Sequence, residues 1–152
     1  MKTDKYYIET YGGLAAGAVT ALISFFVFEP VYNPRWEYLL TKSFDLGIGT
    51  FGFLLAVLAL IVQGNSNSIQ KIKESEVLYK RFVLYNKKVV FLSITICFYS
   101  VIIKLINDGL LLGNKSIVQH IDLSLYLFLI TWFLIDTYRF LKVFYLVIVN
   151  SK

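Results

Sequence analysis

Four long apolar runs, separated by short polar gaps, occupy most of this chain. An α-helix needs about 20 residues to cross the hydrocarbon core of a bilayer, and each run comes close to this length or exceeds it. The runs predict spans at about 12–30, 44–64, 89–110 and 121–145. We therefore expect an all-α fold over residues 1–152, an integral membrane four-helix bundle without a separate extramembrane domain.

The composition favours the same class of protein. Hydrophobic residues make up 57% of the 152 residues and charged residues only 16%, whereas soluble domains carry about 25% charged residues. The first apolar run ends at Glu29-Pro30 without a small-residue cleavage pattern, so we expect it to be retained as a span. Cys97 is the single cysteine and cannot form an internal disulfide.

Basic residues gather at one side of the predicted spans. The gap between the second and third runs holds six of the 15 Lys and Arg residues, and several more lie near the two ends of the chain. The positive-inside rule then predicts that both termini and this gap face the cytoplasm. We expect a basic cytoplasmic helix over about 69–88 that extends into the third span.

The six basic residues of this gap are candidates for binding a signal or a partner. They are Lys71, Lys73, Lys80, Arg81, Lys87 and Lys88. Such a cluster can bind a nucleotide or oligonucleotide, anionic lipid headgroups or an acidic protein. The alternative is that the cluster reflects only the orientation rule for membrane proteins.

A polar stripe runs along the third apolar run at helical spacing. It consists of Asn86, Ser93, Cys97, Ser100, Lys104 and Asn107. Residues at these intervals share one helix face, and polar groups that face lipid cost free energy. Two interpretations stay open: the last five residues line a water-filled pore, or the small ones form a packing seam. In the second case Lys104 reaches the interface or pairs with Asp108.

The first and fourth runs carry their own patterns. Gly13, Gly17 and Ala21 are spaced by four and allow another helix to approach closely, either inside the monomer or between subunits. In the fourth run, the spacing of Asp136 and Arg139 predicts an ion pair. The basic residues at this end are expected to anchor the helix at the inner interface.

The second run contains a formal GxGxxG at Gly47, Gly49 and Gly52. A dinucleotide-binding fingerprint requires a preceding strand, which the sequence does not predict, so we assign these glycines to helix packing or a kink. Before this run, residues Glu37–Lys42 are expected to form a short separate helix on the outer surface.

Catalytic and metal-binding patterns are absent from the sequence. His120 is the single histidine, and no second ligand accompanies it at metal-binding spacing. Asp108, His120 and Asp122 could converge on the outer side, but their spacing suits a loop better than a site. We expect a protein that is not an enzyme and needs no metal or cofactor.

The stretch Thr50–Lys88, TFGFLLAVLALIVQGNSNSIQKIKESEVLYKRFVLYNKK, resembles small four-span bacterial membrane proteins of antiphage defence operons. The layout is similar to the Hailong-type channel effectors and the Kiwa-type membrane subunits. The resemblance implies a tetrameric inner-membrane channel controlled by an oligonucleotide signal that meets the basic gap. It lies in the layout and not in a diagnostic motif, so it assigns no residue a role.

Two functions therefore follow as expectations. The first is a homo-oligomeric ion channel or pore of the bacterial inner membrane, gated from the cytoplasm in antiviral defence. The second is a non-conducting membrane anchor or adaptor that recruits a cytoplasmic partner protein through the same basic gap.

Overall fold

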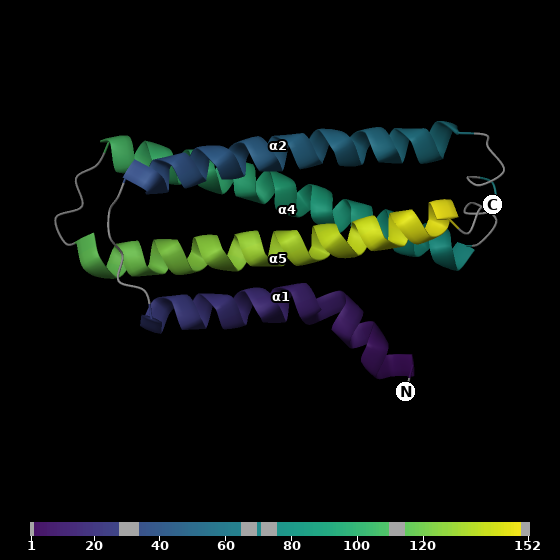
Figure 1. The fold of residues 1–152 in the computed structure, drawn as a ribbon, viewed down its shortest axis with the longest axis horizontal. Helices are drawn as coiled ribbons and strands as arrows, with labels where there is room; N and C mark the ends of the chain where they lie inside the picture. The colour runs from purple at the N-terminus through teal and green to yellow at the C-terminus, as the bar shows by residue number, and fades with distance from the viewer. Residues whose placement is uncertain (1, 28–33, 65–69, 71–75, 110–114, 150–152) are drawn as a thin grey trace.

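The structure is a computed structural model, and it describes residues 2–27, 34–64, 70, 76–109 and 115–149. These residues form long helices and, within the described ranges, no strand (Figure 1). The helices are α1 (Lys2–Val27), α2 (Pro34–Gln63), α4 (Glu76–Gly109) and α5 (Lys115–Val149). The all-α prediction is confirmed.

Three of the helices are long and apolar enough to cross a membrane. The qualifying segments are Glu37–Gln63, Tyr79–Leu105 and His120–Tyr145, while α1 contributes a shorter apolar segment, Tyr11–Val27. Large apolar side chains such as Phe26, Phe91 and Phe98 cover much of the outside. Because soluble monomers rarely expose so much apolar surface, these features indicate a membrane protein.

Helix α2 begins earlier than the sequence predicts, whereas the expected continuity of the basic segment with the third span is confirmed over the described residues. The separate surface helix expected over Glu37–Lys42 is wrong, because these residues are the first turns of α2. Pro34 suits the first turn of a helix, and the residues that follow do not break it. The basic segment is continuous with the third apolar run from Glu76 onward, whereas 71–75 lie outside the described residues.

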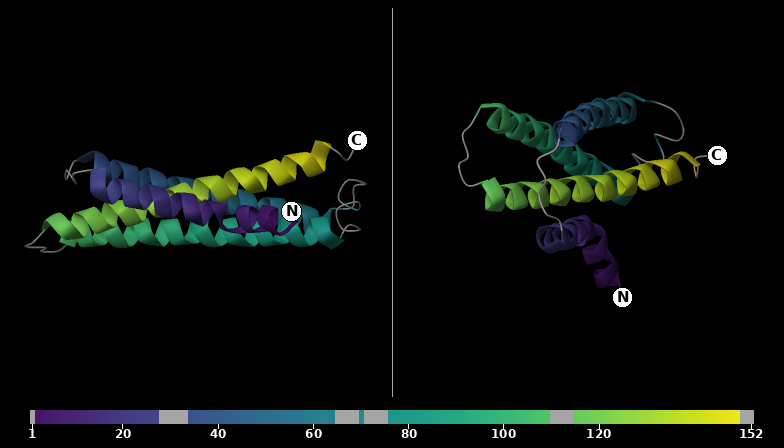
Figure 2. Two further views of the ribbon diagram at one scale, coloured as in Figure 1. Left: turned by 90° about the horizontal axis from the view of Figure 1, so that it is seen from below. Right: turned by 60° about the vertical axis from the view of Figure 1, so that its left-hand side comes forward.

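The helices pack in a row rather than in a square. α1 packs on α5, α5 on α4 and α4 on α2, so that α1 and α2 lie on opposite sides of α5 (Figures 1 and 2). The N-terminal turns of α1 bend away from α5 (Figure 1). The start of α1, the end of α2, the start of α4 and the end of α5 share one end of the row.

The apolar core follows the middle of this row. α4 packs on both α2 and α5, and Phe82 of α4 contacts Phe140 of α5 with ring centroids 5.3 Å apart. The remaining buried members of the core are Leu54, Val57, Ile61, Val89, Leu92, Ile96, Leu129 and Phe133. Apolar side chains therefore surround the polar residues on the packed faces of α4. The site described next lies between α4 and α5 in this part of the row.

Candidate functional site

Asp136 is fully buried near the middle of α5, with 0% of its surface exposed. Burying a carboxylate costs several kcal/mol unless other groups compensate its charge, so its surroundings are informative. Lys88 Nζ of α4 lies 2.8 Å from Asp136 Oδ2. Trp132 Nε1 donates a hydrogen bond of 2.7 Å to the same oxygen. Arg139 Nη1 lies 3.6 Å from Asp136 Oδ1. We call these four residues the charge cluster.

The spacing along α5 explains how three members of the charge cluster meet. Trp132, Asp136 and Arg139 lie four and three residues apart, which places them on one face of the helix. Lys88 enters from α4, and its ammonium also lies 5.7 Å from the centre of the Trp132 ring. The indole therefore contacts both charges, donating to the carboxylate and presenting its π face to the cation.

Helix α1 covers the charge cluster with glycine backbone. A Cβ atom on Gly13 would lie 2.7 Å from Asp136 Oδ1, and one on Gly12 would lie 2.5 Å from Arg139 Nη2. One helical turn further on, a Cβ on Gly17 would lie 2.8 Å from the carbonyl oxygen of Phe128. Gly13 and Gly17 thus pack against α5 within one chain, and the absence of a side chain is what permits this approach.

The charge cluster connects three helices: an ion pair joins α4 to α5, and glycine backbone contact joins α1 to α5. Asp136 Oδ2 has two donors, while Asp136 Oδ1 accepts no hydrogen bond from the described residues and faces the Arg139 guanidinium. Two cations from different helices therefore share one carboxylate. No group of three His, Cys, Asp or Glu side chains among the described residues could hold a metal ion.

The sequence predicted only part of this cluster. The Asp136–Arg139 ion pair was expected and is confirmed. Lys88 was expected to bind an external ligand, and Trp132 was not singled out. A tryptophan four residues before an aspartate inside an apolar run is a further local signal that points to this site.

The polar stripe of α4 lies in the seam between α4 and α2. Ser93 and Ser100 are buried there, and Ser93 Oγ donates to the carbonyl oxygen of Val89 in its own helix. Cys97 Sγ lies 3.7 Å from the carbonyl oxygen of Phe44. A Cβ on Gly47 would lie 2.6 Å from Cys97 Sγ, so this glycine lets the two helices meet.

The rest of the stripe divides between the seam and the outside. Asn86 is buried, and its Nδ2 donates to the carbonyl oxygen of Leu54 at 3.2 Å. Lys104 is exposed, and the side chain of Asn107 lies outside the described residues. Packing within one chain buries the side chains of Ser93 and Ser100 in this conformation. That these residues line a pore stays a prediction.

At the opposite end of the row, α4 and α5 make a second polar contact. The Tyr99 hydroxyl donates to the Asp122 carboxylate and also lies 2.8 Å from the Asp122 carbonyl oxygen. His120 instead contacts the ring of Phe25 in α1, with centroids 5.9 Å apart. The side chain of Asp108 lies outside the described residues. His120 and Asp122 thus have separate partners.

The basic candidates divide into two groups. Lys80, Arg81 and Lys87 are exposed on α4, whereas Lys88 turns inward to the charge cluster. Lys71 and Lys73 lie outside the described residues. A surface that can meet a negatively charged ligand is therefore adjacent in sequence to the cation that holds Asp136.

Comparison of the chain with protein-family models, with curated proteins and with solved structures finds no match. The geometry of the charge cluster and the faces of the helices are therefore the basis for a functional assignment.

Proposed function

We propose that this chain is the subunit of a homo-oligomeric ion channel of the bacterial inner membrane, an effector of antiphage defence opened by a cytoplasmic signal. In this proposal the four helices cross the bilayer with both termini in the cytoplasm. Three helices of sufficient length and apolarity support the membrane assignment. The shared end of the four helices, with the exposed cations of α4, supports the orientation.

The observation that carries the gating proposal is the ion pair between Lys88 and Asp136. Lys88 follows directly after the exposed cation Lys87 on a continuous helix. A polyanion that binds the exposed cations displaces α4, and α4 also supplies Lys88, the partner of Asp136. When Lys88 withdraws, Arg139 is placed to take over the carboxylate. Two cations for one buried carboxylate give two arrangements of α4 against α5, as a switch requires.

Glycine contacts extend this switch to α1. Because Gly13 lies against Asp136, a change in the position of this carboxylate changes the surface on which α1 rests. Packed interfaces move between discrete arrangements and do not deform continuously. The proposed opening step is therefore a shift of α1 and α4 relative to α5.

A flux assay in liposomes tests the proposal. The purified protein is reconstituted, and ion flux is measured with and without short oligonucleotides as the probe. We expect flux that depends on the oligonucleotide in the natural chain, and altered basal flux in Lys88→Gln and Asp136→Asn. Replacing Lys80, Arg81 and Lys87 together with Gln should remove the response. Absence of flux under every condition would reject the channel.

The alternative is a non-conducting anchor or adaptor. One observation favours it: Asn86, Ser93 and Ser100 of the polar stripe are buried, and Asn86 bonds to the α2 backbone, so one chain does not present these three side chains to water. In that case the exposed cations of α4 recruit an acidic cytoplasmic protein. Flux remains absent, while substitution of Lys80, Arg81 and Lys87 releases the partner from membranes.

A further inference from the structure

Helix α2 lies at the edge of the row and packs mainly on α4, which leaves its opposite side open. That open side carries a stripe of polar and small residues, all exposed and spaced by 4, 4, 3, 4 and 7. The stripe consists of Thr41, Asp45, Gly49, Gly52, Ala56 and Gln63. We call it the α2 outer stripe. It faces away from the buried residues Leu40, Leu54 and Ile61, because the two sets are offset by half a turn.

Exposure of the α2 outer stripe to lipid is energetically unfavourable. The side chain of Asp45 is 57% exposed within a segment long enough to span a membrane, and an ionised group facing lipid costs free energy. Nothing lies within 4 Å of a Cβ atom built on Gly49 or Gly52, so this chain itself does not use the space these glycines leave. Glycine weakens a helix relative to alanine, yet here it leaves backbone free for close approach.

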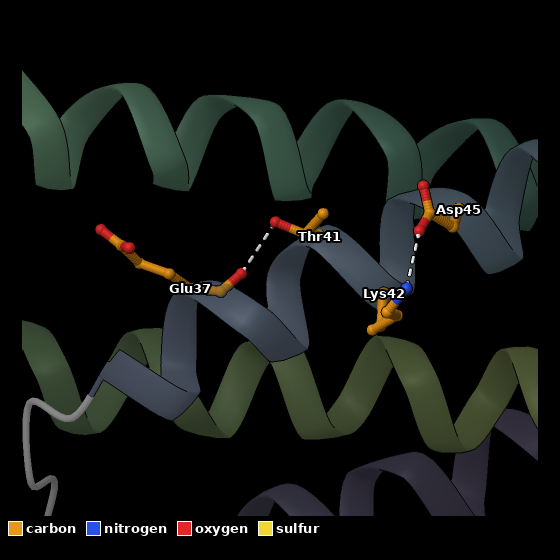
Figure 3. Close-up of polar contacts among 4 residues, drawn as sticks. All are labelled: Glu37, Thr41, Lys42 and Asp45. Carbon is orange, nitrogen blue, oxygen red and sulfur yellow. Dashed lines mark hydrogen bonds and ion pairs between the residues drawn. The ribbon is translucent and has the colours of Figure 1, made fainter.

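Charge on the two edges of the stripe indicates what covers it. Glu37 and Lys42 are five residues apart, which places them about 140° apart around the helix and about 7.5 Å apart along it. Lys42 Nζ reaches Asp45 Oδ2 at 3.4 Å, while the Glu37 side chain points away from both (Figure 3). One edge is therefore acidic and the other basic. Parallel copies around a closed ring bring each basic edge beside the acidic edge of the next copy.

We propose that the α2 outer stripe is the contact between copies of this chain and lines the ion pathway at their axis, an inference that rests on the proposed channel function. The stripe then supplies the polar pore surface that the buried residues of the α4 stripe, Asn86, Ser93 and Ser100, do not. When Lys42 pairs with the acidic edge of the next copy instead of with Asp45, the Asp45 side chains form a ring of carboxylates near the outer mouth, which favours cations. Gly49, Gly52 and Ala56 form the narrow middle, and Gln63 forms the inner mouth.

Cysteine crosslinking in native membranes tests the contact without requiring conduction. Each variant carries Cys97→Ser and one new cysteine, at Gly52 or Ala56 on the stripe or at Phe91 as control. Phe91 is 68% exposed on α4. It lies at nearly the same depth as Gly52, because the antiparallel helices pair Gly47 with Cys97 and Leu54 with Asn86.

A short bifunctional thiol reagent should convert the Gly52→Cys and Ala56→Cys chains to covalent dimers and leave Phe91→Cys monomeric. Gly52→Cys adds its side chain to open space, so the fold of the single chain is preserved. Equal dimer formation at Phe91 would overturn the proposed contact. Failure of both stripe positions to crosslink would overturn it as well, whether native mass measurements find an oligomer or a monomer.

Measurements of ion selectivity distinguish the proposed channel from the proposed lining of its pathway by α2. Asp45→Asn should shift the reversal potential in a salt gradient toward equal passage of cations and anions. A selectivity that changes with Lys104→Gln and not with Asp45→Asn would overturn the lining by α2 and keep the channel. Stripe crosslinks without current under any condition would keep the contact between copies and overturn both the channel and its lining.

Discussion

Lys88 Nζ lies 2.8 Å from Asp136 Oδ2, and this ion pair joins α4 to α5 where the basic segment of α4 enters the packed row. The carboxylate is fully buried, whereas 26% of the lysine side chain remains exposed. The lysine thus belongs partly to the surface and partly to the interior. In the proposed switch, this intermediate position lets a ligand bound on the exposed side of α4 act on the pair.

The first prediction concerns the energy of this pair. Asp136→Leu alone should lower the free energy of unfolding by about 3 kcal/mol, because it leaves the Lys88 ammonium without its buried partner. The double variant Lys88→Met, Asp136→Leu should recover most of the loss, since it removes both charges of this pair and leaves only the partly exposed Arg139 of the cluster. Unfolding in detergent micelles measures both. Additive losses in the double variant would contradict a direct coupling.

The second prediction concerns the contact of α1 with α5. Gly17→Ala should destabilise the protein by about 1–3 kcal/mol, because its Cβ would press on the carbonyl oxygen of Phe128, which belongs to the backbone. Ala15→Leu adds more bulk at an exposed position of the same helix and should change little. The melting temperatures of the two variants give the comparison. Equal melting temperatures would mean that α1 does not pack on α5 as described.

The third prediction concerns the seam between α2 and α4. Ser93→Leu should destabilise the fold by about 1–3 kcal/mol, since it inserts a large side chain into a fully buried position. Ile94→Leu, at the neighbouring exposed position, should be tolerated. Monodispersity and thermal stability in micelles provide the readout. A stable Ser93→Leu variant with altered conductance would instead place Ser93 beside water.

The fourth prediction concerns the proposed signal. Replacing Lys80, Arg81 and Lys87 with Gln should weaken oligonucleotide binding and lower its salt dependence, by about 0.7 in the log–log slope for each phosphate that the protein no longer neutralises. Lys142→Gln removes an exposed charge from α5 and serves as the control. Fluorescence anisotropy at several salt concentrations measures the slope. An unchanged slope would exclude these cations as the binding surface.

The fifth prediction concerns orientation in the membrane. In a Cys97→Ser background, a cysteine at Lys80 should resist a membrane-impermeant thiol reagent in intact cells. A cysteine at Glu37, at the other end of the spans, should react. Both positions are exposed in the structure, so burial does not explain a difference. Labelling at Lys80 without labelling at Glu37 would invert the proposed topology.

Some of the fold could be predicted because it depends on local spacing. The lengths of the apolar runs predict helices, and the interval of three between Asp136 and Arg139 predicts their pairing. The start of α2 was missed, because a proline and a few polar residues are typical of a break, whereas here the helix continues through them. Boundaries are hard to predict since both conformations satisfy the same short-range rules.

The sequence by itself determined the all-α class, the presence of helices of spanning length and the residues that share each helix face. Only the tertiary structure decided what each face meets: the α4 stripe meets α2, Lys88 meets Asp136, and the stripe on α2 meets no other described helix of its own chain. The reason is physical. Helix periodicity fixes directions around one axis, whereas neighbours depend on the order and register in which separate helices pack.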